Sequence, residues 1–149
     1  MFDGLVEYGY LGLFLASFLA ATIIPFSSEA ILTILLTQQL DAAFLLFSAS
    51  AGNVLGSVLN YYLGYKGRYL VLQKWFKINK KNLERAEKRF IKYGISSLLL
   101  AWMPVIGDPL TVIAGMLRIK LHWFLLLVTV GKFLRYLFIV ITVSNLNLV

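Results

Sequence analysis

Four long segments of the chain are almost entirely apolar, with only small polar residues and a few isolated charges inside them. Two of these segments, 42–65 and 121–142, are continuous, and each reaches the roughly 20 residues that a helix needs to cross the hydrocarbon core of a bilayer. A helix that is apolar on all sides is expected where lipid or other helices surround it. The pattern therefore predicts two membrane-spanning helices and excludes an ordinary soluble fold.

Proline interrupts the other two apolar segments, and an acidic residue follows each proline: Glu29 follows Pro25 in segment 9–37, and Asp108 follows Pro104 in segment 95–117. The arms beside the second break are too short to span a bilayer. Broken backbone is tolerated at membrane depth only where protein or a water-filled cavity surrounds it, so two re-entrant hairpins with a carboxylate at each tip are expected. For the first segment, a single tilted helix kinked at Pro25 is the alternative.

The chain also repeats itself after 79 positions. Without a gap, this shift places Pro25 on Pro104, Glu29 on Asp108, Phe44 on Trp123 and Gly52 on Gly131. One hairpin and one spanning helix thus occur twice, and a unit that crosses the membrane an odd number of times must have an inverted copy. The sequence predicts one all-α, inverted-repeat membrane domain over residues 1–149, with units at 1–65 and 94–149 and a linker at 66–93.

The linker is strongly basic, because ten of the fourteen Lys and Arg residues lie between Lys66 and Lys92. Basic residues favour the cytoplasmic side, so we expect a cytoplasmic linker and extracytoplasmic termini. Charged residues surround a short apolar face that predicts a helix lying on the membrane surface and ending at Gly94; the face comprises Leu83, Ala86, Phe90 and Tyr93. Anionic lipid headgroups are the expected partner of this linker. An ordinary charged loop is the alternative.

Composition narrows the classes of function. Apolar residues make up 60% of the chain and charged residues 14%, and the net charge of +7 sits beside apolar segments, which favours anionic lipid over nucleic acid as the partner. Cysteine is absent and His122 is the one histidine, so neither disulfides nor a metal site is expected. Without a Gly-rich phosphate loop or a nucleophile–histidine pair, we expect neither an enzyme nor a cofactor. The acidic N-terminus does not resemble a signal peptide and is expected to remain in the mature protein.

Small and polar residues recur at every fourth position of the first predicted spanning helix: Ser48, Gly52, Gly56, Asn60 and Gly64. This spacing places all five on one stripe. Small residues let another helix approach closely, so the stripe is expected to pack on a hairpin or on a second copy of the chain, which leaves a homodimer open. Direct contact with a ligand is the alternative.

The second predicted spanning helix carries Lys132 and Arg135 near its middle, where an unpaired charge is costly. We expect these cations to line one polar cavity with Glu29 and Asp108. The hairpin tips would complete it, and they contain Pro25, Ser28, Pro104, Gly107 and Pro109. Arg and Lys can bind a phosphate, and a buried carboxylate can carry a proton. A fixed structural ion-pair network, or basic side chains that reach to the headgroup layer, are the alternatives.

Several stretches of the sequence resemble the YqaA family, a short branch of the DedA superfamily of VTT or SNARE-associated membrane proteins: residues 20–29, 52–53, 60–64, 93–94, 103–110 and 114–115. The resemblance covers nearly the whole chain, and the Pro104 to Pro109 stretch is its most specific part. It implies a bacterial-type inner-membrane protein with two facing re-entrant hairpins. Relatives in that superfamily translocate undecaprenyl phosphate and phospholipids, and eukaryotic relatives are lipid scramblases.

Some charges of the superfamily pattern are absent. Glu29 matches the acid of the first hairpin, but Ser57 stands where an acid follows Leu-Gly, and Ala101 and Gly107 stand where arginines flank the second proline. We expect a flippase or scramblase that moves an anionic lipid or lipid phosphate between leaflets, with proton coupling left open. An ion- or proton-coupled transporter of a small solute, and a membrane scaffold without transport activity, are the alternatives.

Overall fold

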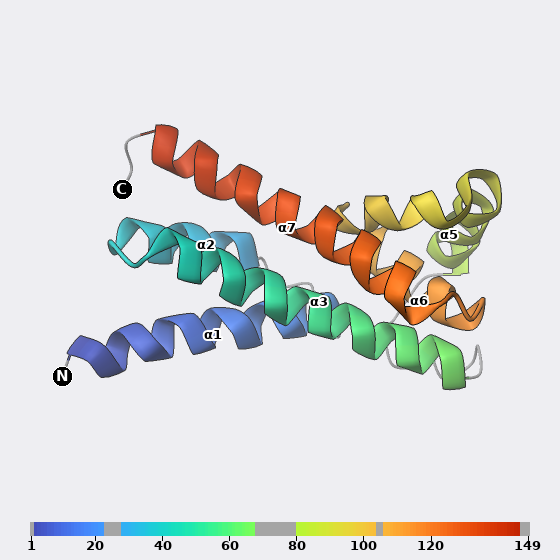
Figure 1. Ribbon diagram of the computed structural model, residues 1–149, viewed down its shortest axis with the longest axis horizontal. Helices are drawn as coiled ribbons and strands as arrows, with labels where there is room; N and C mark the ends of the chain where they lie inside the picture. Colours follow the sequence, from blue (N-terminus) through green and yellow to red (C-terminus); the bar gives the residue numbers. More distant parts are fainter. Residues whose placement is uncertain (1, 23–27, 68–79, 104–105, 147–149) are drawn as a thin grey trace.

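The computed structural model describes residues 2–22, 28–67, 80–103 and 106–146, and the regular structure in these ranges is helical throughout, which confirms the all-α class (Figure 1). The helices are α1 (Phe2–Thr22), α2 (Ser28–Thr37), α3 (Ala42–Lys66), α5 (Lys80–Tyr93), the 3-10 helix η1 (Gly94–Trp102), α6 (Gly107–Met116) and α7 (Leu121–Asn145). Pro25 and Pro104 lie outside the described residues.

The two long helices, α3 and α7, pack against each other and run in opposite directions (Figure 1). Each has 25 residues and is long and apolar enough to cross a membrane. At about 1.5 Å per residue, such a helix exceeds the roughly 30 Å of a hydrocarbon core. Asp41 starts α3, because its carboxylate accepts the backbone N–H groups of Ala43 and Phe44. The two predicted spanning helices are therefore present, and each begins at the predicted residue.

The shorter helices form two antiparallel pairs that approach from opposite ends of the molecule (Figure 1). One pair is α1 and α2, which starts at the end that carries both chain termini. The other pair is η1 and α6, which starts at the end where α5 lies. The first broken segment is thus two helices of opposite direction, and the alternative of one kinked helix is wrong.

The 79-residue displacement also relates the helices. It carries the bounds of α2, Ser28–Thr37, onto those of α6, Gly107–Met116, and the bounds of α3 onto those of α7. The turns after α2 and α6 match as well, because Gln39 and Arg118 occupy equivalent positions and have φ angles of 61° and 53°. Positive φ is uncommon for residues other than glycine. The two units therefore share helix lengths and turn geometry.

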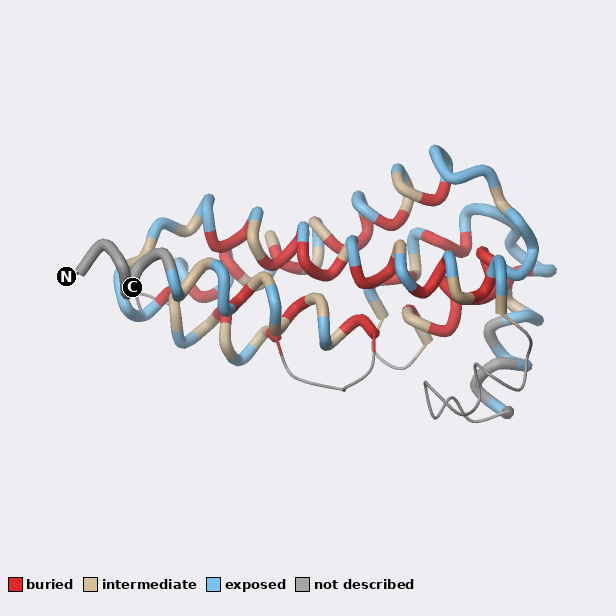
Figure 2. Tube along the Cα trace, turned by 90° about the horizontal axis from the view of Figure 1, so that it is seen from below, coloured by how far each residue is buried: buried red, intermediate tan, exposed pale blue. Residues whose placement is uncertain are grey.

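Large apolar side chains cover the outside of the long helices, whereas a set of polar side chains lies inside the described part of the protein. Phe44 on α3 is 64% exposed and Phe138 on α7 is 71% exposed. The buried polar residues are Ser17, Thr22, Ser28, Ser50, Asn53, Ser57, Asn60, Ser97, Thr111 and Lys132. The tube in Figure 2 shows buried positions running along the length of the helices, on their facing sides. This distribution suits a surface that contacts lipid and not water.

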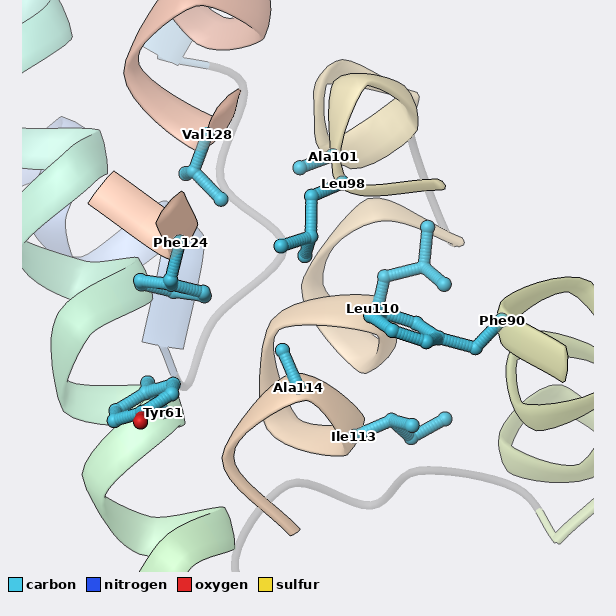
Figure 3. Packing of buried hydrophobic residues seen from close by; sticks show 9 residues of the cluster. All are labelled: Tyr61, Phe90, Leu98, Ala101, Leu110, Ile113, Ala114, Phe124 and Val128. Atoms are coloured by element: carbon cyan, nitrogen blue, oxygen red, sulfur yellow. The ribbon is translucent and has the colours of Figure 1, made fainter. Parts of the chain in front are cut away.

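The basic segment contains the helix α5, so the alternative of an ordinary loop is wrong for its second half, and Gly94 ends the helix with a φ of 66°. Its predicted apolar face needs a correction. Phe90 is only 5% exposed and belongs to the same buried cluster as Leu110 and Ile113 of α6 (Figure 3). Tyr93 is exposed. Phe90 therefore anchors α5 to the protein core instead of contributing to a lipid-facing stripe; the side chains of Leu83 and Ala86 lie outside the described residues.

The small-residue stripe packs on both helix pairs. A Cβ atom at Gly52 would collide with the backbone carbonyl of Phe14 in α1, and one at Gly64 would collide with that of Val112 in α6. Gly56 faces α1 as well. Close approach of backbones is what glycine at such positions allows. Gly52, Gly56 and Gly64 of the stripe thus pack within the chain.

Candidate functional site

One turn in the middle of α7 carries three polar side chains, Lys132, Arg135 and Tyr136. The apolar sequence around them forms helix because its backbone groups are satisfied internally, which a lipid environment demands. Spacings of three and four residues bring these side chains to neighbouring positions on the helix. They face the ends of the shorter helices, which meet α7 at this turn.

Lys132 is almost completely buried, with 3% of its side chain exposed, and its ammonium donates to two acceptors. It binds Asp108 Oδ1 at 3.2 Å and also donates to Asn53 Oδ1 of α3. Asp108 lies in the first turn of α6, where unpaired backbone N–H groups favour a carboxylate. Because Lys132 binds inward, the alternative that it reaches to the headgroup layer is wrong.

Arg135 joins the two helix pairs. Its guanidinium forms an ion pair with Glu29 in the first turn of α2, and it donates a second hydrogen bond of 2.9 Å to the backbone oxygen of Trp102, the last residue of η1. The last carbonyls of a helix lack partners within the helix, so Trp102 offers a ready acceptor. A single side chain thus binds one end of each pair.

The four charged residues that the sequence singled out are therefore arranged as two ion pairs, Glu29 with Arg135 and Asp108 with Lys132. Ser28, Gly107 and Pro109 are buried beside them at the starts of α2 and α6. The Asp108 side chain is 43% exposed although it lies beside Lys132, at the level of the middle of α7. A carboxylate cannot face hydrocarbon without a large penalty, so its exposed side needs water or a polar ligand.

Two further side chains were not expected in this cluster. Tyr136 is fully buried, and its hydroxyl lies 2.8 Å from Ser28 Oγ and accepts a 2.8 Å hydrogen bond from the amide of Asn53. In the sequence, Tyr136 is one of many aromatic residues in an apolar segment. Asn53 has a weak signal in the sequence, because it lies 79 positions before Lys132.

A second contact between the helix pairs comes from Asn60 on α3. Its amide donates to the backbone oxygen of Ala21 in α1 at 2.8 Å and to Thr111 Oγ1 in α6 at 3.1 Å. Thr111 in turn donates to the backbone oxygen of Asp108 at 2.6 Å. Asn60 is a member of the predicted packing stripe. Through Thr111, it also connects α3 to the first turn of α6, which contains Asp108.

Two helices long and apolar enough to span a membrane, an apolar exterior and partly buried ion pairs at mid-length indicate an α-helical membrane protein. Residues 4–145 match the VTT domain, and the chain therefore belongs to the VTT domain family, the DedA superfamily of the resemblance. The inner membrane protein YqaA of Escherichia coli is 38% identical over 125 residues, which are 83% of each chain. A YqaA-family membership is thus confirmed.

Two other relatives extend the similarity. An uncharacterized protein of Haemophilus influenzae is 35% identical over 135 residues, covering 83% of this chain and 80% of the relative. The uncharacterized membrane protein YbfM of Bacillus subtilis is 27% identical over 149 residues, covering 95% of this chain and 91% of the relative. No solved structure matches the chain. The Escherichia coli and Bacillus subtilis relatives are described as membrane proteins.

Proposed function

We propose that this protein moves an anionic lipid or a lipid phosphate between the leaflets of a bacterial inner membrane. One observation carries the proposal: the starts of α2 and α6 and the end of η1 meet two basic residues at the middle of α7. A headgroup that crosses the bilayer needs a polar partner at that depth. Membership of the VTT domain family is consistent with such a role.

In this proposal the helix pairs α1–α2 and η1–α6 are re-entrant hairpins, and the two halves of the protein are inverted copies. The equal lengths of the matched helices and their opposite directions support this arrangement (Figure 1). Binding sites between inverted halves at mid-bilayer are common in transporters. The hairpin ends at Glu29 and Asp108 then form the two sides of one site.

Arg135 is the proposed headgroup ligand. A guanidinium binds phosphate oxygens in a two-pronged geometry, so a lipid phosphate can replace Glu29 at Arg135. Lys132 adds a second positive charge one turn away, next to the partly exposed Asp108. The acyl chains can stay in lipid, along the exposed apolar faces of α3 and α7, while the headgroup passes the site.

The pattern of missing superfamily charges fits this assignment. A Cβ atom at Gly107 would collide with the backbone oxygen of Ala101, so the two positions where related proteins carry arginine pack directly on each other here. A long side chain has no room at Gly107. We propose that Lys132 and Arg135 supply, from α7, the positive charge that those arginines supply in relatives.

Leaflet exchange in proteoliposomes tests the function. A fluorescent phospholipid and a labelled polyprenyl phosphate are compared for wild type and for Glu29→Gln, Asp108→Asn and Arg135→Ala. Glu87→Gln removes an exposed charge on α5 and serves as the control. We expect exchange in wild type and the control, and at least a tenfold loss of the exchange rate in Arg135→Ala, which corresponds to about 1.4 kcal/mol in the barrier to exchange. A folded protein that exchanges neither lipid overturns the proposal.

Two other functions give different results in the same preparation. A small-solute transporter exchanges no lipid but shows a solute flux that Glu29→Gln abolishes. A scaffold shows neither activity, and cells that carry Glu29→Gln and Asp108→Asn keep a normal phenotype.

Proton coupling of lipid movement is tested by imposing a pH gradient across the proteoliposome membrane. The gradient must change the exchange rate of the wild type and leave the exchange rate of Glu29→Gln unchanged.

A further inference from the structure

A continuous chain of side-chain hydrogen bonds connects the two hairpin ends. It runs from Asp108 to Lys132, then to Asn53, Tyr136 and Ser28, and alternates between helices: α6, α7, α3, α7 and α2. Ser28 is the first residue of α2 and directly precedes Glu29. The chain therefore joins the Asp108–Lys132 pair to the neighbourhood of the Glu29–Arg135 pair.

The direction of three of the four bonds in this chain follows from chemistry, and in the fourth, between Tyr136 and Ser28, either hydroxyl can donate. An ammonium can only donate, so Asn53 Oδ1 accepts from Lys132 and the Asn53 amide nitrogen donates to Tyr136. The Tyr136 hydroxyl proton is then available for Ser28 Oγ. The two neighbours of Asn53 therefore fix the orientation of its amide, which cannot turn without losing a bond.

Most of these hydrogen bonds are buried, so breaking one of them is costly. Lys132, Asn53, Tyr136 and Ser28 are all buried, and only the Asp108 end is substantially exposed. In a low-dielectric interior an unsatisfied polar group is costly, and linked hydrogen bonds strengthen one another. A change of partner at Lys132 must therefore be accommodated by its buried neighbours.

We infer that Asn53 and Tyr136 are positioning residues that couple the two ion pairs, so that release of Asp108 from Lys132 weakens the binding of Glu29 to Arg135. Asn53 fixes the Lys132 ammonium, and the Tyr136 hydroxyl fixes Asn53 and Ser28. The inference deepens the proposed function, because it makes the carboxylates of the two hairpins respond to one headgroup together. Only the joint response to a headgroup rests on the proposed function; the coupling of the two ion pairs does not.

A double-mutant cycle on stability tests the coupling without any lipid transport. Glu29→Gln, Asp108→Asn and the double variant are made, and chemical unfolding in detergent micelles is measured for each. Glu29 and Asp108 bind different partners, so independent pairs would give additive effects. We expect the unfolding constant of the double variant to differ from the additive value by about threefold or more.

The same cycle is then repeated in a Tyr136→Phe background, which keeps the ring and removes the hydroxyl. We expect the two substitutions to become additive. Tyr62→Phe, which removes a hydroxyl on the exposed side of α3, is the control and must leave the coupling unchanged. If Tyr136→Phe does not fold, Ser28→Ala breaks the last bond of the chain and must have the same effect.

Coupling of equal size with and without the hydroxyl would show that charge alone connects the pairs, and it would overturn the inference. Additivity in the wild-type background would overturn it as well. A protein that shows hydroxyl-dependent coupling but exchanges no lipid leaves the inference standing and removes the proposed function. The two failures are therefore distinguishable.

Discussion

Lys132 donates a hydrogen bond to Asn53, the residue that stands 79 positions before it. The same displacement carries α2 onto α6 and α3 onto α7. A residue touches its own counterpart only where a two-fold axis between the units passes close to both. The contact therefore supports the proposed inverted arrangement, and it puts the buried cation at the point that both units share. One unit supplies a neutral amide there and the other a charge, so the site is asymmetric in charge.

Removing either partner of the Lys132–Asp108 pair should have unequal effects. Asp108→Asn leaves a buried ammonium with a neutral acceptor, which we expect to destabilise the protein by about 2 kcal/mol. Lys132→Met leaves a carboxylate that water can reach, so its loss should be smaller, and the double variant should be more stable than Asp108→Asn alone. Thermal unfolding in detergent ranks the stabilities of the two single variants and the double variant. Equal losses for the two single variants would contradict it.

The sequence predicted the spanning helices and both breaks because their signals are local. Apolar runs of sufficient length, and prolines that break the interior of a helix, need no knowledge of neighbours. The four charged residues could also be predicted, since an ionisable group in an apolar segment must find a partner. Which acid binds which cation could not, because that pairing depends on how helices cross.

The missed features depend on packing. Tyr136 is one aromatic among many until its hydroxyl is seen between Ser28 and Asn53. Phe90 shares the periodicity of a membrane-surface helix, and only the position of α6 shows that protein covers it. The backbone oxygen of Trp102 has no sequence signature at all, since every residue has one.

Glycine substitutions in α1 and α3 should separate the effect of close packing on stability from the effect of helix propensity. Gly52→Ala places a Cβ atom against the Phe14 carbonyl, and a backbone group cannot rotate away, so we expect a loss of about 1–3 kcal/mol. At Gly12 no atom lies within 4 Å of an added Cβ, so Gly12→Ala should be neutral or stabilising by up to about 1 kcal/mol. Unfolding midpoints in detergent check both. A Gly12→Ala loss as large as that of Gly52→Ala would refute the packing argument.

The turn after α2 offers a stabilising substitution. Gln39 has a φ of 61°, a conformation that is strained for most residues and free for glycine. We expect Gln39→Gly to raise stability by about 1 kcal/mol. Arg118→Gly at the equivalent position should gain less, because the Arg118 guanidinium lies 4.7 Å from the centre of the Tyr65 ring and that attraction is lost. Thermal unfolding ranks the two variants, and a larger gain at Arg118 would contradict the explanation.

The exposed basic residues of α5 should bind anionic lipid. Arg85, Lys88 and Lys92 are exposed, and each basic residue near an anionic surface contributes about 1 kcal/mol at low salt. We expect added phosphatidylglycerol to raise the unfolding midpoint of the wild type, and salt to weaken the effect. The triple glutamine variant should lose most of the shift.

Zwitterionic phosphatidylcholine provides the control lipid for that experiment, and Glu84→Gln provides the control variant, since it removes an exposed charge of the opposite sign. An equal phosphatidylglycerol shift in the wild type and the triple variant would place the anionic lipid elsewhere on the protein.

The two ends of the molecule should face opposite sides of the membrane. The turn after α2 lies at the end that holds both termini, and the turn after α6 lies at the end that holds α5 (Figure 1). Residues 1–65 contain no Lys or Arg, whereas Arg118, Lys120 and the basic residues of α5 gather at the other end. Basic residues favour the cytoplasm, so the α5 end should be cytoplasmic.

Gln38 and Leu117 are exposed, occupy equivalent positions in the two turns and allow a matched test, because the chain has no cysteine of its own. With a maleimide that cannot cross membranes, Gln38→Cys should be labelled in intact spheroplasts and Leu117→Cys only in inverted vesicles. Labelling of both from the same side would overturn the inverted arrangement. The reversed pattern would keep that arrangement, and it would show that basic residues do not set the orientation of this protein.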